Sequence, residues 1–264
     1  MILVGERAAE TTGALSAVIK LVNDSGAKLG WIPRRAGEKG AIAAGALPNL
    51  LPGNRAITDA SARVDIATAW NIDSLPSEVG MSSNEIINSD LQAVLIGGVD
   101  PMDISADAKI KLAKKFVVSL EIRQSDITDI ASVVLPVAAV VEKSGSFMDW
   151  QGSARNFEAA VEQSLNRSDV RILSMLADEI GKPINLATVK SARNEFESIG
   201  NWDGSKNSMK PVAAASVINT SGDEAVLNSW RNLLDKGSMQ DGEDNLAGTA
   251  RKSVVFISSA RAKA

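Results

Sequence analysis

Apolar residues in the first part of the chain switch between the spacing of strands and the spacing of helices. Short aliphatic runs predict strands at residues 2–4 and 29–32. The apolar positions between them recur on one helix face, at Leu15, Val18, Ile19 and Val22. We expect Thr11 or Thr12 to cap this helix and Gly26 to follow its end. A strand, a helix and a strand at this spacing predict a parallel βαβ unit.

The same alternation returns in the middle of the chain. Strands are predicted at residues 93–96, 116–120 and 133–136, with helices at 104–115 and 125–130. The Gly- and Ala-rich residues 34–53 predict a structured loop with a short helix. Repeated strand and helix alternation predicts an α/β fold, a Rossmann-like doubly wound and mostly parallel sheet.

Beyond Gly152 the pattern becomes helical. Apolar stripes predict helices at residues 170–180 and 189–199, and a polar Gly-rich linker follows at 200–211. A third stripe predicts a helix at 226–234, and a β-branched run predicts a strand at 253–258. The predicted organisation is therefore a Rossmann-like part (1–152), a helical extension (153–200) and a linker, helix and truncated terminal segment (201–264).

Composition and charge then narrow the function. The chain has five Phe, five Trp and no Tyr, so aliphatic side chains must fill its core. Its 28 basic and 32 acidic residues give a net charge of −4. The basic cluster at residues 109–115 fits the solvated side of a helix. No basic face is indicated, which argues against nucleic-acid binding.

The chain contains neither Cys nor His, and this absence removes whole chemistries. Ser-His-Asp and Cys-His nucleophile systems cannot be built from it. Zinc sites that use Cys or His and Cys-ligated iron–sulfur clusters are likewise excluded within the chain. We therefore predict no catalytic residue and no metal ligand here.

Membrane insertion is not indicated by the hydropathy pattern. The longest uninterrupted apolar run, residues 133–141, is far shorter than the roughly 20 residues that span a bilayer. The first four residues lead directly to charged Glu6 and Arg7, so no signal peptide is predicted. These features predict a cytoplasmic protein without a direct membrane span.

Three segments carry a family resemblance. They are GAIAAGALPNLLPG at residues 40–53, GGVDP at 97–101, and residues 125–152 with VVLP followed by EKSGSF. Residues 240–242 and 246–251 add to the set. In this order they resemble the G subunit of NADH-quinone oxidoreductase, which is the large peripheral-arm subunit of respiratory complex I. The resemblance is to the C-terminal part of that subunit's molybdopterin-oxidoreductase-like region.

The resemblance implies a structural, non-catalytic segment of a proton-translocating enzyme. The parent complex passes electrons from NADH through FMN and iron–sulfur clusters to a quinone, and none of these cofactors would be ligated by this chain. The implied partners are other peripheral-arm subunits at the inner face of the bacterial plasma membrane. Two alternatives stay open: a chain of an active molybdopterin guanine dinucleotide enzyme of the formate dehydrogenase type, and a freestanding nucleotide-binding module.

The resemblance also implies a remnant cofactor cleft. Its candidate residues are Gly97, Gly98, Asp100, Glu142 and Gly145. Each also has a purely structural interpretation. Asp100 would cap the next helix, and Gly145 would supply a positive φ in a turn that Phe147 and Trp150 pin to the core.

Two departures from the family pattern predict a dependent polypeptide. The cluster-binding half of the family should precede this chain, and a C-terminal β-barrel would follow Arg251. We therefore expect a fragment, the product of a split gene or a short protein. Exposed apolar surface is expected unless a partner covers it.

Overall fold

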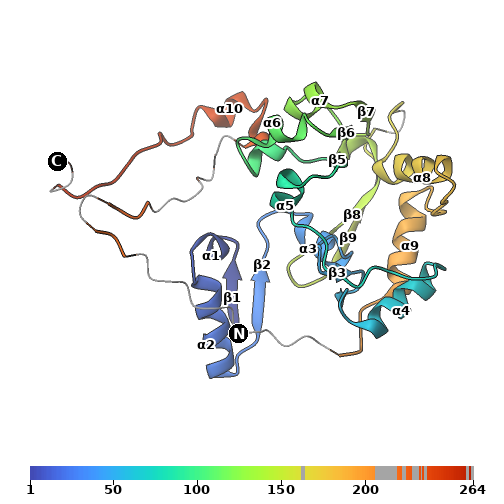
Figure 1. Cartoon of the computed structure of the whole chain (residues 1–264), viewed down its shortest axis with the longest axis horizontal. Coiled ribbons are helices and arrows are strands. Elements are labelled where there is room, and N and C mark those ends of the chain that lie inside the picture. The colour runs from blue at the N-terminus through green and yellow to red at the C-terminus, as the bar shows by residue number, and fades with distance from the viewer. Residues whose placement is uncertain are drawn as a thin grey trace. The chain divides into compact units, whose positions relative to one another are not determined.

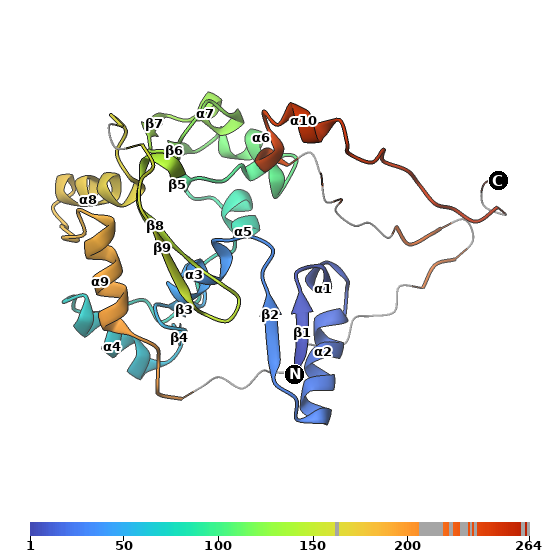
Figure 2. The same cartoon turned by 180° about the vertical axis from the view of Figure 1, so that it is seen from behind.

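The computed structural model describes residues 1–161, 164–205, 219–221, 224–227, 232, 234, 237–259 and 262. They belong to two compact units, Met1–Ala215 and Ser216–Ala264. In the first unit, helices alternate with short strands along the chain (Figures 1 and 2). The predicted class, a mixed α/β fold with parallel sheets, is confirmed. The boundaries predicted at residues 152 and 200 remain predictions.

The chain begins with the predicted βαβ unit. Its elements are β1 (Ile2–Gly5), α1 (Arg7–Glu10), α2 (Ala14–Ser25) and β2 (Leu29–Ile32). β1 and β2 pair in parallel as a two-stranded sheet. The predicted cap of α2 is wrong, because Gly13 occupies the N-cap position with a φ of 81° and no side chain caps the helix. Gly26 follows the helix with a φ of 62°, as expected.

The next region contains the predicted short helix and four elements that the sequence pattern did not predict. The helix is α3 (Glu38–Ala43). The additional elements are β3 (Leu50–Leu51), β4 (Arg55–Ala56), α4 (Ala60–Ala69) and α5 (Ser83–Asn88). β3 and β4 form a small antiparallel pair. Ser82 caps α5 in a reciprocal pair of hydrogen bonds with Glu85.

Three strands form the second parallel sheet, in the order β5-β6-β7. They are β5 (Ala93–Gly97), β6 (Phe116–Glu121) and β7 (Val133–Pro136), close to the predicted positions. The helix α7 (Asp126–Ile130) joins β6 to β7 as predicted. The helix predicted at 104–115 is shorter, since a 3₁₀ turn η1 (Pro101–Asp103) comes first and α6 covers only Ala108–Leu112.

The hydrophobic core lies between this sheet and its helices. It joins Ile87 of α5, residues of α6 and α7, and the strand residues Val94 and Val117. Leu112 of α6 and Ile127 of α7 are 1% and 0% exposed. Aliphatic side chains fill this core, as the composition predicted.

A hairpin and two helices complete the first unit. The hairpin strands β8 (Gly145–Met148) and β9 (Ala154–Phe157) pair antiparallel, and neither was predicted. The helices α8 (Asp169–Glu179) and α9 (Val189–Ile199) match the two predicted apolar stripes. No helix in the described residues has both the length and the apolar character that crossing a bilayer requires.

The unit Ser216–Ala264 carries little regular structure in its described residues. It contains the 3₁₀ turn η3 (Ser238–Gln240) and the short helix α10 (Asp244–Ala247). The strand predicted at 253–258 is wrong, because this segment has no strand assignment among the described residues and Phe256 is 80% exposed. Val226 and Leu227 lie outside any helix, while Trp230 and Leu233 of the predicted stripe lie outside the described residues. Residues 206–211 of the predicted linker also lie outside them, and the described part contains no closed barrel.

Leu112 and Ile110 provide a matched test of the core, because both lie on α6 but only Leu112 is buried (1% against 69% exposed). Leu112→Ala should lower the free energy of unfolding by about 2–5 kcal/mol, through lost burial and the cavity left behind. Ile110→Ala should change it by less than about 0.5 kcal/mol. Denaturant unfolding of both variants measures the difference. Equal losses would contradict the assigned core.

Candidate cofactor-binding turns and a buried arginine network

Four of the five predicted site residues lie at or beyond the carboxyl ends of the strands in the β5-β6-β7 sheet. Gly97 ends β5 and pairs with Leu120 of β6, and the turn with Gly98 and Asp100 follows it. Glu142 ends the 3₁₀ turn η2 (Val140–Glu142), which follows β7. Ligands of open α/β sheets bind at this edge. The position of these four residues therefore suits a former cofactor site.

The Gly97–Pro101 turn uses its polar groups to hold itself together. Gly98 has a φ of 64°, and its backbone N–H donates to the Leu120 carbonyl at 3.1 Å. The Asp100 carboxylate accepts the backbone N–H of Met102 at 3.0 Å. Asp100 thus caps the 3₁₀ turn η1, while the N-cap of the following helix α6 is Asp107.

Glu142 organises the loop in which it lies. Its Oε2 accepts the Ala139 N–H at 2.8 Å and the Asn166 side-chain amide at 3.4 Å. The pKa of Glu142 is below its ordinary value, first because of the Ala139 hydrogen bond and then because of Ser164 and Asn166. A carboxyl group held ionised in this way serves as a fixed acceptor.

The close approach of the Phe157 ring requires a glycine at position 145. The positive φ that the sequence predicted for Gly145 is wrong. It starts β8, and its φ is not among the positive values of the described glycines. A Cβ at this position would lie 2.4 Å from Cζ of Phe157. The Phe157 ring stacks on Phe147 with centroids 5.1 Å apart. Phe147 and Trp150 are 39% and 40% exposed, so they do not pin the turn into the buried core as expected.

The hairpin is also tied to α9. Arg193 donates from Nη2 to the Gly145 carbonyl and from Nε to the Ser146 hydroxyl, both at 3.0 Å. Gly145 is therefore held by the ring of Phe157 on one side and by a guanidinium on its carbonyl. The structure gives it a packing role in the hairpin.

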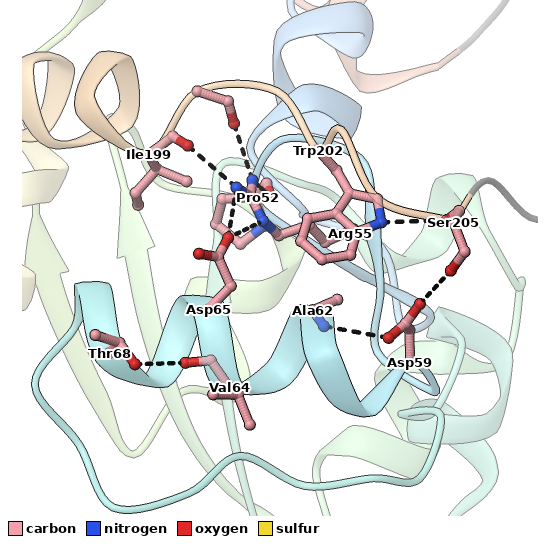
Figure 3. A network of polar contacts seen from close by, with 11 residues as sticks. Pro52, Arg55, Asp59, Ala62, Val64, Asp65, Thr68, Ile199, Trp202 and Ser205 are labelled. Carbon is pink, nitrogen blue, oxygen red and sulfur yellow. Dashed lines mark hydrogen bonds and ion pairs between the residues drawn. The ribbon is translucent and has the colours of Figure 1, made fainter.

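The most developed polar network centres on Arg55, which sequence reasoning missed (Figure 3). Arg55 is 4% exposed. Its Nε and Nη2 both contact Oδ2 of Asp65 on α4, at 2.7 and 2.6 Å. Its Cζ lies 5.3 Å from the centroid of the Trp202 ring, a cation–π contact.

The other Arg55 hydrogen bonds cap the end of α9. Nη1 donates to the Pro52 and Gly200 carbonyls, both at 2.9 Å, and Nη2 donates to the Ile199 carbonyl at 3.1 Å. The last carbonyls of a helix have no partner within it, and a cation there also suits the helix dipole. Ile199 and Gly200 lie 144 and 145 positions from Arg55 in the sequence, so no local sequence pattern could have revealed the contact.

Asp59 fastens the segment after α9 to α4 (Figure 3). Its carboxylate accepts the N–H groups of Ser61 and Ala62 at 2.8 and 3.2 Å, and the Ser205 hydroxyl at 2.6 Å. The Ser205 hydrogen bond is the first cause that places the pKa of Asp59 below its ordinary value, followed by the Ala62 hydrogen bond. The network joins segments far apart in sequence.

A metal centre is not suggested by the acidic side chains. Within the part of the chain that the structure describes, no three of them gather closely enough to hold an ion. The candidate residues Asp100 and Glu142 hold their own loops, and the arginine network joins segments far apart in the sequence.

Removal of the Arg55 guanidinium should be costly. Arg55→Ala should lower the free energy of unfolding by about 2–4 kcal/mol, because the α9 carbonyls lose their donors and a cavity remains. Arg155→Ala, at an exposed arginine of β9, should cost less than about 0.5 kcal/mol. Thermal unfolding of the purified variants checks both values. A matching small loss in the two variants would show that the network does not stabilise the fold.

The close approach at Gly145 gives a second prediction. Gly145→Ala should displace the Phe157 ring and cost about 1 kcal/mol, the worth of an aromatic pair. Gly5→Ala is the control, because nothing lies within 4 Å of a Cβ there and it too lies in a strand. Urea unfolding compares the two. If Gly145→Ala is no worse than the control, Phe157 does not require the glycine.

Comparison with known proteins agrees with this picture of the fold. The family model described as molybdopterin oxidoreductase matches residues 1–179. The G subunit of NADH-quinone oxidoreductase from Mycobacterium bovis is 44% identical over 98% of this chain and 33% of its own length. The corresponding subunit of Streptomyces coelicolor is 41% identical over 99% of the chain and 32% of its own length.

A more distant relative carries a different function. The F420-dependent formate dehydrogenase 2 subunit alpha of Methanococcus maripaludis is 31% identical over 54% of the chain. The chain spans about a third of the length of the two NADH-quinone oxidoreductase relatives. The family match nevertheless covers well over half of the chain, from β1 to the end of α8. The chain therefore belongs to the molybdopterin oxidoreductase family.

Proposed function

We propose that the chain is a structural, non-catalytic segment of the large peripheral-arm subunit in a proton-translocating NADH-quinone oxidoreductase. The observation that carries the proposal is the similarity to that subunit of M. bovis along 98% of the chain at 44% identity. In such a complex, electrons pass from NADH through FMN and iron–sulfur clusters to a quinone. The segment would brace the polypeptides that hold these cofactors.

The side-chain chemistry supports a role without redox centres. Iron–sulfur clusters take Cys, or occasionally His, as ligands, and the chain has neither. Its well-partnered polar residues, Arg55 above all, stabilise contacts between distant segments. Polypeptides other than this chain would hold the iron–sulfur clusters and the FMN of the proposed complex.

The predicted turn residues use part of their polar groups within the chain. The Gly98 N–H, a donor that a phosphate at the turn could use, is donated to the Leu120 carbonyl. Asp100 and Glu142 already accept hydrogen bonds from the chain. These internal contacts support turns that persist for structural reasons.

The alternative function is a chain of an active molybdopterin guanine dinucleotide enzyme. The similarity to a formate dehydrogenase subunit alpha favours it, although that match covers 54% of the chain. The position of Gly97, Asp100 and Glu142 at the carboxyl edge of the sheet also suits it. A bound pterin nucleotide in the purified complex would separate the alternative from our proposal.

The proposed partners are other peripheral-arm subunits of the complex. We place the chain on the cytoplasmic side of the bacterial plasma membrane, attached peripherally through these subunits. The chain has a net charge of −4, and its sequence has no extended basic cluster apart from residues 109–115. These features support protein partners over nucleic acid.

Affinity purification of the tagged chain from solubilised membranes tests the proposal. NADH-oxidising and cluster-bearing subunits should be enriched with the chain, together with NADH:quinone activity in the eluate. The same tag on an unrelated cytoplasmic protein is the control. Recovery of the chain alone, as a soluble monomer that turns over a substrate, would overturn the proposal.

A further inference from the structure

Among the described residues, helices cover the β5-β6-β7 sheet on one face only. The strands follow each other in chain order across the sheet, so both crossovers run in the same direction. Crossovers between parallel strands are right-handed in about 98% of cases, which places α6 and α7 on the same face. The core agrees, because Ala108 and Leu112 of α6 and Ile127 of α7 pack with Val94 and Val117.

The opposite face is apolar and open to solvent. Leu95, Val118 and Val133 are register partners, so they form one row across the three strands. Leu95 is 49% exposed and Val133 is 38% exposed, and Phe116 on the same face is 52% exposed. We call these four residues the open sheet face. They are the exposed apolar surface that the sequence predicted, and no charged residue of the three strands points to this side.

An open face of this kind is unusual for a parallel sheet. Parallel sheets occur almost only with both faces covered, usually by helices that connect their strands. The chain covers this face only at the carboxyl end of the strands, where Leu120 is 3% exposed. Toward the amino end of β6, Phe116 on the same face is 52% exposed. β5 also has a free edge, since it pairs with β6 alone among the described strands. The sheet thus lacks a layer of helices and has room for further parallel strands.

We propose that the open sheet face binds helices of the large peripheral-arm subunit that lie outside the region matched by this chain. The inference rests on the proposed function. Roughly two thirds of the length of the M. bovis relative lies outside the match, enough polypeptide for a second layer. Those helices would follow strands added at the β5 edge and present an apolar stripe to Leu95, Phe116 and Val133.

Photo-crosslinking in the assembled complex tests this contact directly. A benzoylphenylalanine is placed at Leu95, and the matched control carries it at Ile110, an exposed residue of α6 on the covered side. The Leu95 probe should form adducts with residues of the large peripheral-arm subunit outside the matched region, identified by mass spectrometry. The Ile110 probe should not form these adducts. Adducts of Leu95 with a second copy of the chain, or no adduct in an intact complex, would overturn the proposal.

A charge placed on the face supplies an independent readout. Leu95→Glu should reduce the amount of chain recovered with the complex roughly tenfold or more, because burial of an unpaired carboxylate is strongly unfavourable. Ile110→Glu should leave recovery unchanged. If wild-type chain purifies with the complex and Leu95→Glu does so equally well, the docking face is wrong while the proposed function stands. If wild-type chain never enters the complex, the proposed function itself fails.

Discussion

Burial of a parallel sheet on both faces is the requirement that shapes this molecule. Parallel strands need crossovers, and crossovers that proceed in one direction put their helices on one side. In the β5-β6-β7 sheet, this produces a well-packed core around Val94, Leu112 and Val117 and leaves Leu95 and Phe116 exposed. In the described part of the chain, one face of the sheet therefore has no covering layer, and the chain spans about a third of the length of its NADH-quinone oxidoreductase relatives.

The charged groups serve the same structural purpose. Arg55 closes the end of α9 and contacts Asp65, while Asp59 caps α4 and accepts from Ser205. Glu142 holds the loop after β7, and Arg193 holds the hairpin at Gly145. Each of these four side chains therefore binds groups of the chain itself. Together with the lack of Cys and His, this arrangement suits a support for redox polypeptides rather than a redox centre.

The sequence predicted what depends on local periodicity. The strands Leu29–Ile32 and Val133–Pro136 and the helices α8 and α9 follow apolar spacing, and they appear where expected. The hairpin β8–β9 was missed because its short strands contain Gly, Ser, Asn and Arg and show no clean alternation. The opposite error occurred at residues 253–258, where a β-branched run forms no strand because strands need a neighbour to pair with.

Of the candidate site, the sequence predicted the location better than the chemistry. The strand-then-glycine order correctly placed Gly97 at the end of β5 and Asp100 beyond it, but only the structure shows that the Gly98 N–H and the Asp100 carboxylate are engaged. The most direct measurement of redox inertness is the molybdenum and pterin content of the purified complex, per copy of this chain. A structural segment predicts neither component above background. One molybdenum and one pterin nucleotide for each chain would contradict it.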